Sequence, residues 1–256
     1  MMHRFFLPRL EATPGRPIRP DTEVLLEDPD ARHITRVLRL RPGDRIVLCD
    51  GRGFDYDAVV VRTGASSVIA RVGAHRPSPG EAPLFVTLVQ GVPKADKMDL
   101  IVQKAVEVGV GRIIPAFTER TVVRWDAGKA DARRRRWQRI AAEAAKQSGR
   151  GRVPEVAAAV PLREIWRRPD LGTVIVPWEE ARGAGLRRAL AGVPRGPVTL
   201  VIGPEGGLSR QEVDDAVGRG AFPVTLGPRV LRTETAGLVA AAIVLYEWGD
   251  LGGDTP

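Results

Sequence analysis

After residue 83, short apolar stretches alternate with helical patterns, and two of those stretches run straight into loops rich in glycine and proline. The first loop spans residues 202–208 (IGPEGGL) and the second spans residues 226–236 (LGPRVLRTETA). The alternation predicts a parallel sheet flanked by helices. Since glycine allows positive φ and close backbone approach, paired loops at strand ends predict a small-molecule site.

The composition excludes several kinds of site. Cys49 is the only cysteine and the three histidines are scattered, so the chain offers neither a disulfide nor a cysteine metal cluster, and we expect no metal. No serine–histidine–acid order accompanies the loops, which argues against triad hydrolases. No apolar run is long enough to cross a bilayer, and the apolar start of the chain is too short for a secretory signal. We therefore expect a cytoplasmic protein with no membrane partner.

The net charge of +8 is concentrated in one segment. Residues 121–168 contain 13 basic and 5 acidic residues, which is the whole surplus, and the rest of the chain is balanced. A local basic patch on a balanced protein is typical of a polyanion partner such as nucleic acid. The alternative is a solvated helix face in a chain that uses 34 Arg against 5 Lys.

A proline-rich stretch at residues 75–83 is typical of a linker. Before it lie β-type runs at residues 45–49, 56–61 and 68–72, and a glycine-containing turn joins the first two. A short helix is predicted ahead of them, with Asp28 as N-cap and Pro29 at the first helical position. We therefore expect a small β-barrel domain at residues 1–74, a linker at 75–83 and an α/β domain at 84–256.

The α/β domain is expected to hold strands at residues 84–90, 112–116, 173–177 and 198–203. One helix should run from Asp96 to Gly109, and an arginine-bearing helix should cover about residues 132–146. A capping box, Ser209-x-x-Glu212, should start a helix that ends with Gly220 as its C-terminal cap.

The final helix, at about residues 235–248, is apolar nearly all round. A helix without a polar face must be covered on every side, either by its own fold or by a second subunit. We favour a homodimer through this region.

Taken alone, the Gly-Pro-Glu-Gly-Gly sequence is a weak motif, because many tight strand-to-helix turns resemble it. It lacks the Gly-Lys-Ser/Thr of a P-loop and the GxGxxG of a dinucleotide site. The second loop strengthens the functional interpretation, because its Arg-Thr-Glu-Thr cluster (residues 232–235) can handle a proton or a negative charge.

Together with three further stretches, the two loops resemble the bacterial 16S rRNA (uracil-N3)-methyltransferases of RsmE type, within the SPOUT superfamily. The further stretches are residues 33–44 (HITRVLR with PGD), 94–109 (KADKMDLIVQKAVEVG) and 143–150 (EAAKQSGR). The resemblance runs essentially end to end, and five ordered motifs are far more specific than one. Two mild departures are Lys146, where an acidic residue is expected, and Trp178, which occupies a variable loop position.

The resemblance implies an N-terminal PUA-like β-barrel that helps to bind RNA and a C-terminal α/β domain with a deep trefoil knot, acting as a homodimer. S-adenosylmethionine (SAM) is expected in the knot, between three loops. The expected SAM-binding residues are Pro177, Trp178, Glu179, Gly203, Pro204, Glu205, Gly206, Gly207, Leu226, Gly227, Leu231, Arg232, Thr235 and Ala236.

The reaction implied is methyl transfer from SAM to N3 of a uridine in the decoding region of 16S rRNA (m3U1498 type), on the assembled small ribosomal subunit. The sulfonium already activates the methyl group, so the enzyme mainly aligns donor and acceptor. Uracil N3 must lose a proton, and we expect Arg232 to stabilise the resulting charge and Glu234 to act as base. Thr233 or Thr235 either caps the last helix or positions the base.

The residues expected to bind RNA are Arg4, Arg36, Arg39, Lys94, Arg133, Arg136, Gln147 and Arg150. Three other functions compete with this interpretation. They are an RNA-binding assembly factor without catalysis, a sister enzyme that modifies tRNA or 23S rRNA at a ribose 2′-OH, and a nicotinamide-dependent oxidoreductase. The intact glycine loops and Arg232 argue against the first, and the missing dinucleotide fingerprint argues against the last.

Overall fold

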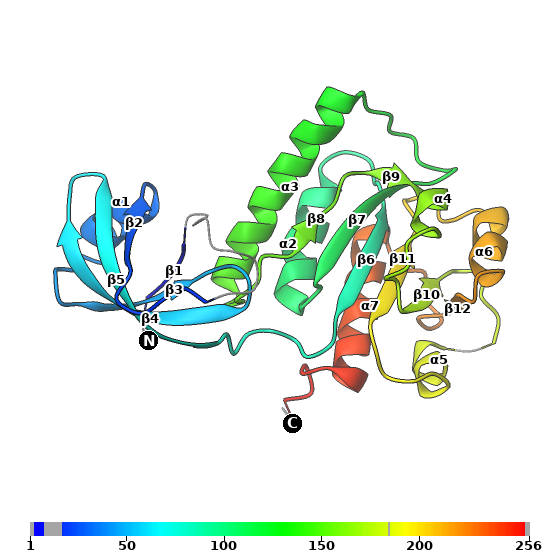
Figure 1. Ribbon diagram of the computed structural model, residues 1–256. Coiled ribbons are helices and arrows are strands. Elements are labelled where there is room, and N and C mark those ends of the chain that lie inside the picture. The colour runs from blue at the N-terminus through cyan, green and yellow to red at the C-terminus, as the bar shows by residue number, and fades with distance from the viewer. Residues whose placement is uncertain (1–2, 8–16, 184, 254–256) are drawn as a thin grey trace. The chain divides into compact units, whose positions relative to one another are not determined.

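The computed structural model describes residues 3–7, 17–183 and 185–253, and the chain forms two compact units (Figure 1). Unit 1 comprises the described residues up to Glu81 together with Ala145–Val153, and unit 2 comprises the remainder. The change of unit after Glu81 falls inside the expected linker. Residues 145–153, by contrast, were expected to lie in the second domain, and strand β5 reaches Pro77, the third residue of the expected linker.

Unit 1 is built on a five-stranded sheet in the order β1-β3-β4-β5-β2. Strands β1 and β3 are parallel and the other pairs are antiparallel. The strands are β1 Arg4–Phe6, β2 Glu23–Glu27, β3 Arg45–Cys49, β4 Phe54–Thr63 and β5 Ser67–Pro77. The three predicted runs correspond to β3, β4 and β5, the last two being longer than expected.

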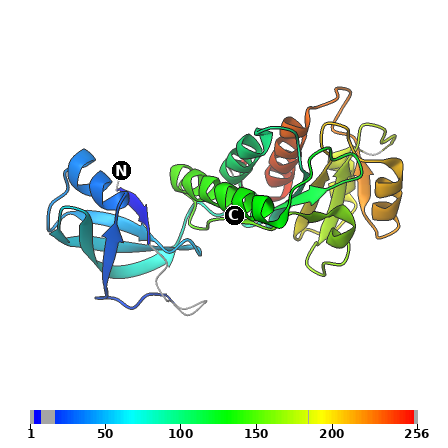
Figure 2. The same cartoon turned by 90° about the horizontal axis from the view of Figure 1, so that it is seen from above.

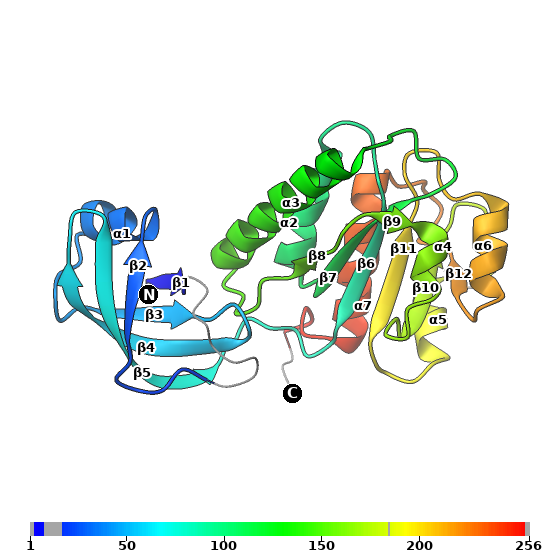
Figure 3. The same cartoon turned by 45° about the horizontal axis from the view of Figure 1, so that its top comes forward.

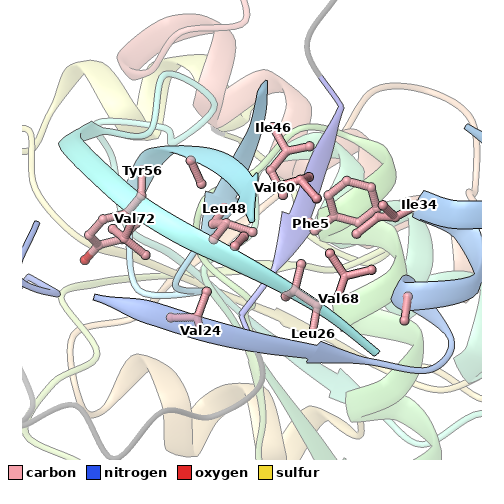
Figure 4. Close-up of a cluster of buried hydrophobic side chains, with 13 residues drawn as sticks. Phe5, Val24, Leu26, Ile34, Ile46, Leu48, Tyr56, Val60, Val68 and Val72 are labelled. Atoms are coloured by element: carbon pink, nitrogen blue, oxygen red, sulfur yellow. The ribbon is translucent and has the colours of Figure 1, made fainter. Parts of the chain in front are cut away.

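Alternation along these strands produces the core of unit 1. In β2 every second residue is buried, so Val24 and Leu26 point inward. Figure 4 shows them in one cluster with Leu48, Tyr56 and other buried hydrophobic side chains from the rest of the sheet. Burial of this apolar surface is the main favourable term in the folding of the unit.

The short helix of unit 1 differs from the prediction. Helix α1 covers Asp30–Arg32 and continues as a π-helical turn, His33–Val37, so Pro29 rather than Asp28 is the N-cap. The Asp28 carboxylate instead pairs with Arg32, at 2.7 Å. Asp28 therefore forms an ion pair with a side chain four residues later instead of capping the helix N-terminus.

Residues 145–153 complete unit 1 through backbone hydrogen bonds. The N–H of Gly53 donates to the carbonyl of Gly151 (3.0 Å), and the N–H of Val153 donates to that of Gly51 (3.1 Å). Lys146 also forms an ion pair with Asp30. The segment thus extends the structure around the β3–β4 turn.

A buried polar cluster centres on Arg4. Its guanidinium donates to the Asp55 carboxylate, to the Gly149 carbonyl and to Ser78 Oγ. Ser78 in turn donates to Asp55 at 2.6 Å. Burial raises the pKa of the neighbouring Cys49 thiol to about 11, so this cysteine stays protonated and unreactive near neutral pH.

Replacing Arg4 by alanine should destabilise unit 1 by about 3 kcal/mol, because it leaves the buried Asp55 carboxylate without its counter-charge. The matched control is Arg71→Ala, which breaks the exposed Arg71–Glu23 pair and should cost less than about 1 kcal/mol. Hydrogen exchange in β3–β5 measures the effect on unit 1, while fluorescence follows unit 2, which contains all five tryptophans. Equal exchange rates in the two variants would contradict the stabilising role given to the Arg4–Asp55 pair.

Unit 2 contains a parallel sheet in the order β12-β10-β11-β6-β7-β8, with β9 also paired to β7. This confirms the expected parallel sheet. Its strands are β6 Val86–Gly91, β7 Arg112–Phe117, β8 Glu155–Val156, β9 Val160–Pro161, β10 Thr173–Pro177, β11 Val198–Ile202 and β12 Phe222–Val224. The sequence patterns predicted β6, β7, β10 and β11 but missed the three shortest strands.

The helices of unit 2 cover both faces of this sheet. Figure 2 shows α2 and α7 side by side along one face, while α4 and α6 pack over the other face around a second apolar core. The helices are α2 Lys97–Val108, α3 Ala127–Gln147, α4 Leu162–Ile165, α5 Leu186–Ala191, α6 Arg210–Val217 and α7 Thr233–Trp248. Both sheet faces are therefore buried, as an all-parallel sheet requires.

Helix ends agree with most of the predicted caps. The Ser209–Glu212 capping box is present, and Gly109 ends α2 with a φ of 118°. Helix α6 ends earlier than expected, with Gly218 rather than Gly220 as its C-cap. Helix α3 begins five residues before the expected position, because Asp126 accepts a hydrogen bond from the N–H of Lys129.

The final helix, α7, is only partly covered within one chain. One face is buried against the sheet and α2 through small and aliphatic residues that include Gly237, Ala241 and Val244. The remaining apolar side chains are half-buried, and Tyr246 is 65% exposed. Its own fold therefore does not cover every side of this helix.

Within the described ranges, no helix combines the length and the apolar character needed to span a membrane. Over the same residues, no group of three or more His, Cys, Asp or Glu side chains is arranged to hold a metal ion.

Candidate active site

The register of unit 2 brings the predicted loops to one edge of the sheet. Pro177 of β10 pairs with Val224 of β12, and Ile202 of β11 pairs with Gln90 of β6. These four strands are neighbours and run in the same direction, so their following loops emerge together. In Figure 3 strands β6 and β11 run towards the edge at which α7 begins.

Residues 203–207, here called the glycine loop, need glycine for steric reasons. A Cβ on Gly203 would lie 2.6 Å from the carbonyl carbon of Gly207, and one on Gly207 would lie 2.5 Å from Glu179 Oε1. Gly207 also has a φ of +70°. The loop therefore folds tightly on itself and against the end of β10.

Neighbouring segments brace the glycine loop from outside. Pro204 packs over Gly91, where a Cβ would lie 2.6 Å from Pro204 Cδ. The guanidinium of Arg120 donates to the Gly206 carbonyl at 2.8 Å. The loop is thus fixed by the last residue of β6 and by a residue that follows β7, as well as by its own turn.

Residues 226–232, here called the last loop, have a more open backbone. Gly227 has a φ of +115°, and no atom lies within 4 Å of the position that its Cβ would take. Val230 is 83% exposed, whereas Leu226 and Leu231 are half-buried. This combination leaves backbone polar groups accessible beside two apolar side chains.

A buried relay joins the two loops to the central strand. Gln90 Nε2 donates to Thr233 Oγ1 at 2.9 Å, and Thr233 Oγ1 donates to the Gly203 carbonyl at 2.6 Å. Gln90 is fully buried and Thr233 nearly so. Of the two roles expected for Thr233, capping is not observed, because Arg232 is the N-cap of α7 and the Thr233 hydroxyl bonds elsewhere.

Lys97 makes a second link between the glycine loop and the start of α7, through Glu205 and Glu234. Its ammonium lies 3.1 Å from Glu205 Oε1 and 3.2 Å from Glu234 Oε2. These two hydrogen bonds raise the pKa of Lys97. Burial pushes the pKa of Glu205 upward, but bonds from backbone N–H groups and from Lys97 outweigh it and leave that pKa lowered.

Glu234, the predicted base, is held in its ionised form. Its own backbone N–H lowers its pKa first, and Lys97 and Arg232 lower it further. A carboxylate with a lowered pKa is a weaker proton acceptor. Arg232 is exposed, and its carbonyl accepts the N–H groups of Thr235 and Ala236, both at 2.8 Å.

The segment after β10 has a mainly structural tryptophan. The backbone N–H of Trp178 donates to the Val224 carbonyl at 3.0 Å. The indole ring packs in the core beside α6, with the Arg210 guanidinium 5.2 Å from the ring centre. Pro177 is half-buried and Glu179 is exposed at the glycine loop.

Four of the predicted RNA-binding residues are engaged in internal contacts. Arg4 lies in the polar cluster of unit 1, and Arg150 is 5% exposed with its guanidinium on Glu81 at 3.1 Å. In unit 2, Arg133 pairs with Asp96 and Arg136 with Asp99, both next to the start of α2. These contacts favour structural roles for Arg4 and Arg150, whereas the Arg136 side chain remains 53% exposed beside its partner.

Like Arg136, the remaining predicted RNA-binding residues are exposed, namely Arg36, Arg39, Lys94 and Gln147. Arg39 has a φ of 55° and Lys94 precedes α2, where its N–H donates to Glu205. Sequence reasoning missed Gln90, Lys97 and Arg120 as parts of the site. A polar residue inside the apolar strand β6 was the available signal for Gln90, and the quoted motif at residues 94–109 contained Lys97.

Two surface hollows lie away from the loops. One, of about 220 Å³, lies at the amino end of β10 between Leu171, Gly172 and Arg219. The other, of about 250 Å³, lies between Phe117, Trp166 and Glu212. Neither is lined by residues of the glycine loop or the last loop, so the candidate site rests on the chemistry of the loops rather than on cavity depth.

Comparison with known proteins identifies the family. Residues 80–245 match the model of an RNA methyltransferase domain, and residues 26–73 match that of an RNA methyltransferase PUA domain. The chain is 35% identical over 231 residues to the ribosomal RNA small subunit methyltransferase E of Bacillus subtilis, covering 88% of this chain and 90% of that protein. This chain belongs to the ribosomal RNA small subunit methyltransferase E family.

Solved structures of similar proteins have the same fold. The enzyme of Neisseria gonorrhoeae, solved with S-adenosylmethionine, is 35% identical and superposes with a TM-score of 0.82 over 98% of this chain and 99% of its own. A Legionella pneumophila protein solved with SAM is 31% identical, with a TM-score of 0.82 over 98% of this chain and all of its own. The expected family and the PUA-like and α/β domains are thereby confirmed.

Gly203→Ala should distort the glycine loop, because the new methyl group meets backbone atoms of Gly207 that cannot move aside. We expect a loss of roughly 2 kcal/mol in the free energy of unfolding, together with weaker SAM binding. Gly192→Ala is the control, since its Cβ finds only ordinary contacts at 3.6 Å or more and its φ is −90°. Thermal unfolding and calorimetric titration with SAM measure both effects, and equal behaviour of the two variants would exclude a tight glycine loop.

Proposed function

We propose that this protein transfers the methyl group of SAM to N3 of a uridine in 16S rRNA, acting on the small ribosomal subunit. One observation carries the proposal: four aligned strand ends bring the glycine loop, the last loop and Arg232 to one edge of a methyltransferase fold. The relatives named above, which share the fold end to end, support the same activity.

The residues at this edge fit SAM. Gly227 leaves open space where a side chain would stand, and Leu226 and Leu231 offer apolar surface for an adenine ring. When bound, SAM supplies an activated methyl group, so no metal is needed.

Arg232 is our candidate for the group that assists the acceptor. It is exposed at the first turn of α7, beside the glycine loop and the last loop. A guanidinium near O2 or O4 of uracil stabilises the charge that develops as N3 loses its proton. Because its lowered pKa and its pairing with Lys97 make Glu234 a weak proton acceptor, we assign the stabilising role to Arg232 ahead of a proton-accepting role for Glu234.

RNA contacts are assigned to the exposed basic and polar residues of the original set. Arg36 and Arg39 lie in unit 1, Lys94 lies beside the glycine loop, and Gln147 ends α3. Phosphate contacts of this kind position a nucleic acid without reading its sequence. We propose that the protein acts in the cytoplasm, where ribosomal subunits are found.

Two further features extend the proposal. The family resemblance supports a deep trefoil knot formed by the chain segments around the SAM loops. The partly covered apolar face of α7, with Tyr246 exposed next to half-buried Ile243, supports a homodimer through this helix.

Arg232→Ala should lower the rate of methyl transfer by roughly a hundredfold or more while SAM affinity stays close to that of the wild type. Arg229→Ala is the matched control, because Arg229 is an exposed arginine of the same loop, and it should retain activity within about threefold. The assay measures transfer from labelled SAM to small subunits that lack the modification, with naked 16S rRNA in parallel, and maps the product nucleoside. Transfer to a ribose or to another RNA would refute the uridine N3 assignment.

Ile243→Glu should convert the dimer into a monomer, because it places a charge in the apolar face of α7. Val217→Glu changes an exposed apolar residue of α6 and should leave the mass in solution unchanged. Light scattering after size-exclusion chromatography measures both masses. A wild-type protein that is already monomeric at micromolar concentration would rule out the dimer.

A further inference from the structure

Lys97 holds an unusual position among the charged residues of unit 2. It is the first residue of α2, and its ammonium lies between two carboxylates that are far apart in the sequence. Glu205 belongs to the glycine loop and Glu234 to the first turn of α7, immediately after the last loop. All three side chains are one quarter to one third exposed, so the contacts are only partly shielded from bulk water.

The contact to Glu205 is reinforced by the backbone. The N–H of Lys94 donates to both carboxylate oxygens of Glu205, each at 3.2 Å. The segment that follows β6 therefore binds the glycine loop through one backbone group and one ammonium. By contrast, Glu234 is reached from this segment by the Lys97 ammonium alone.

The lysine acts together with the buried relay described above. Gln90 and Thr233 fix the first residue of the glycine loop, Gly203, to the first residue of α7. Lys97 fixes the residues that follow, Glu205 and Glu234. Two separate attachments between the same two segments prevent one from rotating about the other, which a single attachment would allow.

We infer that Lys97 is a positioning residue that sets the spacing between the glycine loop and the start of α7, and so pre-forms the SAM site; this inference rests on the proposed function. Without the Lys97 ammonium, the two carboxylates lose the positive charge that lies between them, and their repulsion separates the two segments. Part of the free energy of SAM binding is then used to bring the glycine loop and the start of α7 together, so the observed affinity for SAM falls by that amount.

The test compares Lys97→Met with Lys97→Arg and with Lys104→Met. Lys104 lies on the same helix and is also paired with a carboxylate, but its partner, Glu107, belongs to that helix, so it joins no loops. Calorimetric titration with SAM should give a dissociation constant roughly threefold to tenfold higher for Lys97→Met than for the wild type. Lys97→Arg should recover most of the affinity because it keeps the charge, and Lys104→Met should match the wild type.

Steady-state kinetics provides a readout that a general loss of stability would not reproduce. We expect Lys97→Met to raise KM for SAM while KM for the small subunit and kcat at saturating SAM stay near the wild-type values. Thermal unfolding of all variants separates folding defects from binding defects, and Lys97→Gln, an uncharged and shorter polar side chain, replaces Lys97→Met if that variant does not fold.

The outcomes are distinguishable. Equal SAM affinity in the wild type and in Lys97→Met, or equal losses in Lys97→Met and Lys104→Met, would overturn the positioning role and leave the proposed methyltransferase function intact. Failure of the folded wild-type protein to bind SAM would instead overturn the proposed function, and the role of Lys97 would fall with it.

Discussion

The buried amide of Gln90 is the contact on which the arrangement of the candidate site depends. It lies on a central strand and reaches, through one hydroxyl, both the start of the last helix and the start of the glycine loop. Its buried Nε2 group finds its partners inside the protein, at Thr233 Oγ1 and the Gly91 carbonyl, so this end of the side chain specifies the geometry of the segments around it. The parallel register places the ends of the strands in a row, and the Gln90 amide then fixes the glycine loop and the start of α7 next to each other.

The electrostatics of the chain are more local than its net charge suggests. The arginine-rich helix α3 carries much of the surplus, yet Arg133 and Arg136 face aspartates at the start of α2. Asp99 also accepts the indole N–H of Trp137 at 3.0 Å, so these charges help to dock the two helices. A count of basic residues therefore overstates the positive surface that an RNA backbone would meet.

Much of the architecture was predictable from the sequence because it follows from strong local signals. Apolar strands, the capping box at Ser209 and the left-handed Gly109 were assigned correctly, and the order of motifs gave the family. The short strands β1, β8, β9 and β12 contain too few residues to show a period. The roles of Gln90 and Lys97 depend on partners more than a hundred residues away, which no local pattern encodes. For the same reason, Arg4 and Arg150 looked like free cations until the acids beside them were located.

Unit 1 is not a continuous stretch of chain, because residues 145–153 complete it from within the sequence of the second unit. During synthesis from the amino terminus, its strands leave the ribosome long before that closing segment does. By then β6, α2, β7 and most of α3 have also emerged. Unit 1 is therefore translated first but cannot complete its fold until residue 153 has been synthesised. A fusion protein that ended at residue 81 would lack part of this unit.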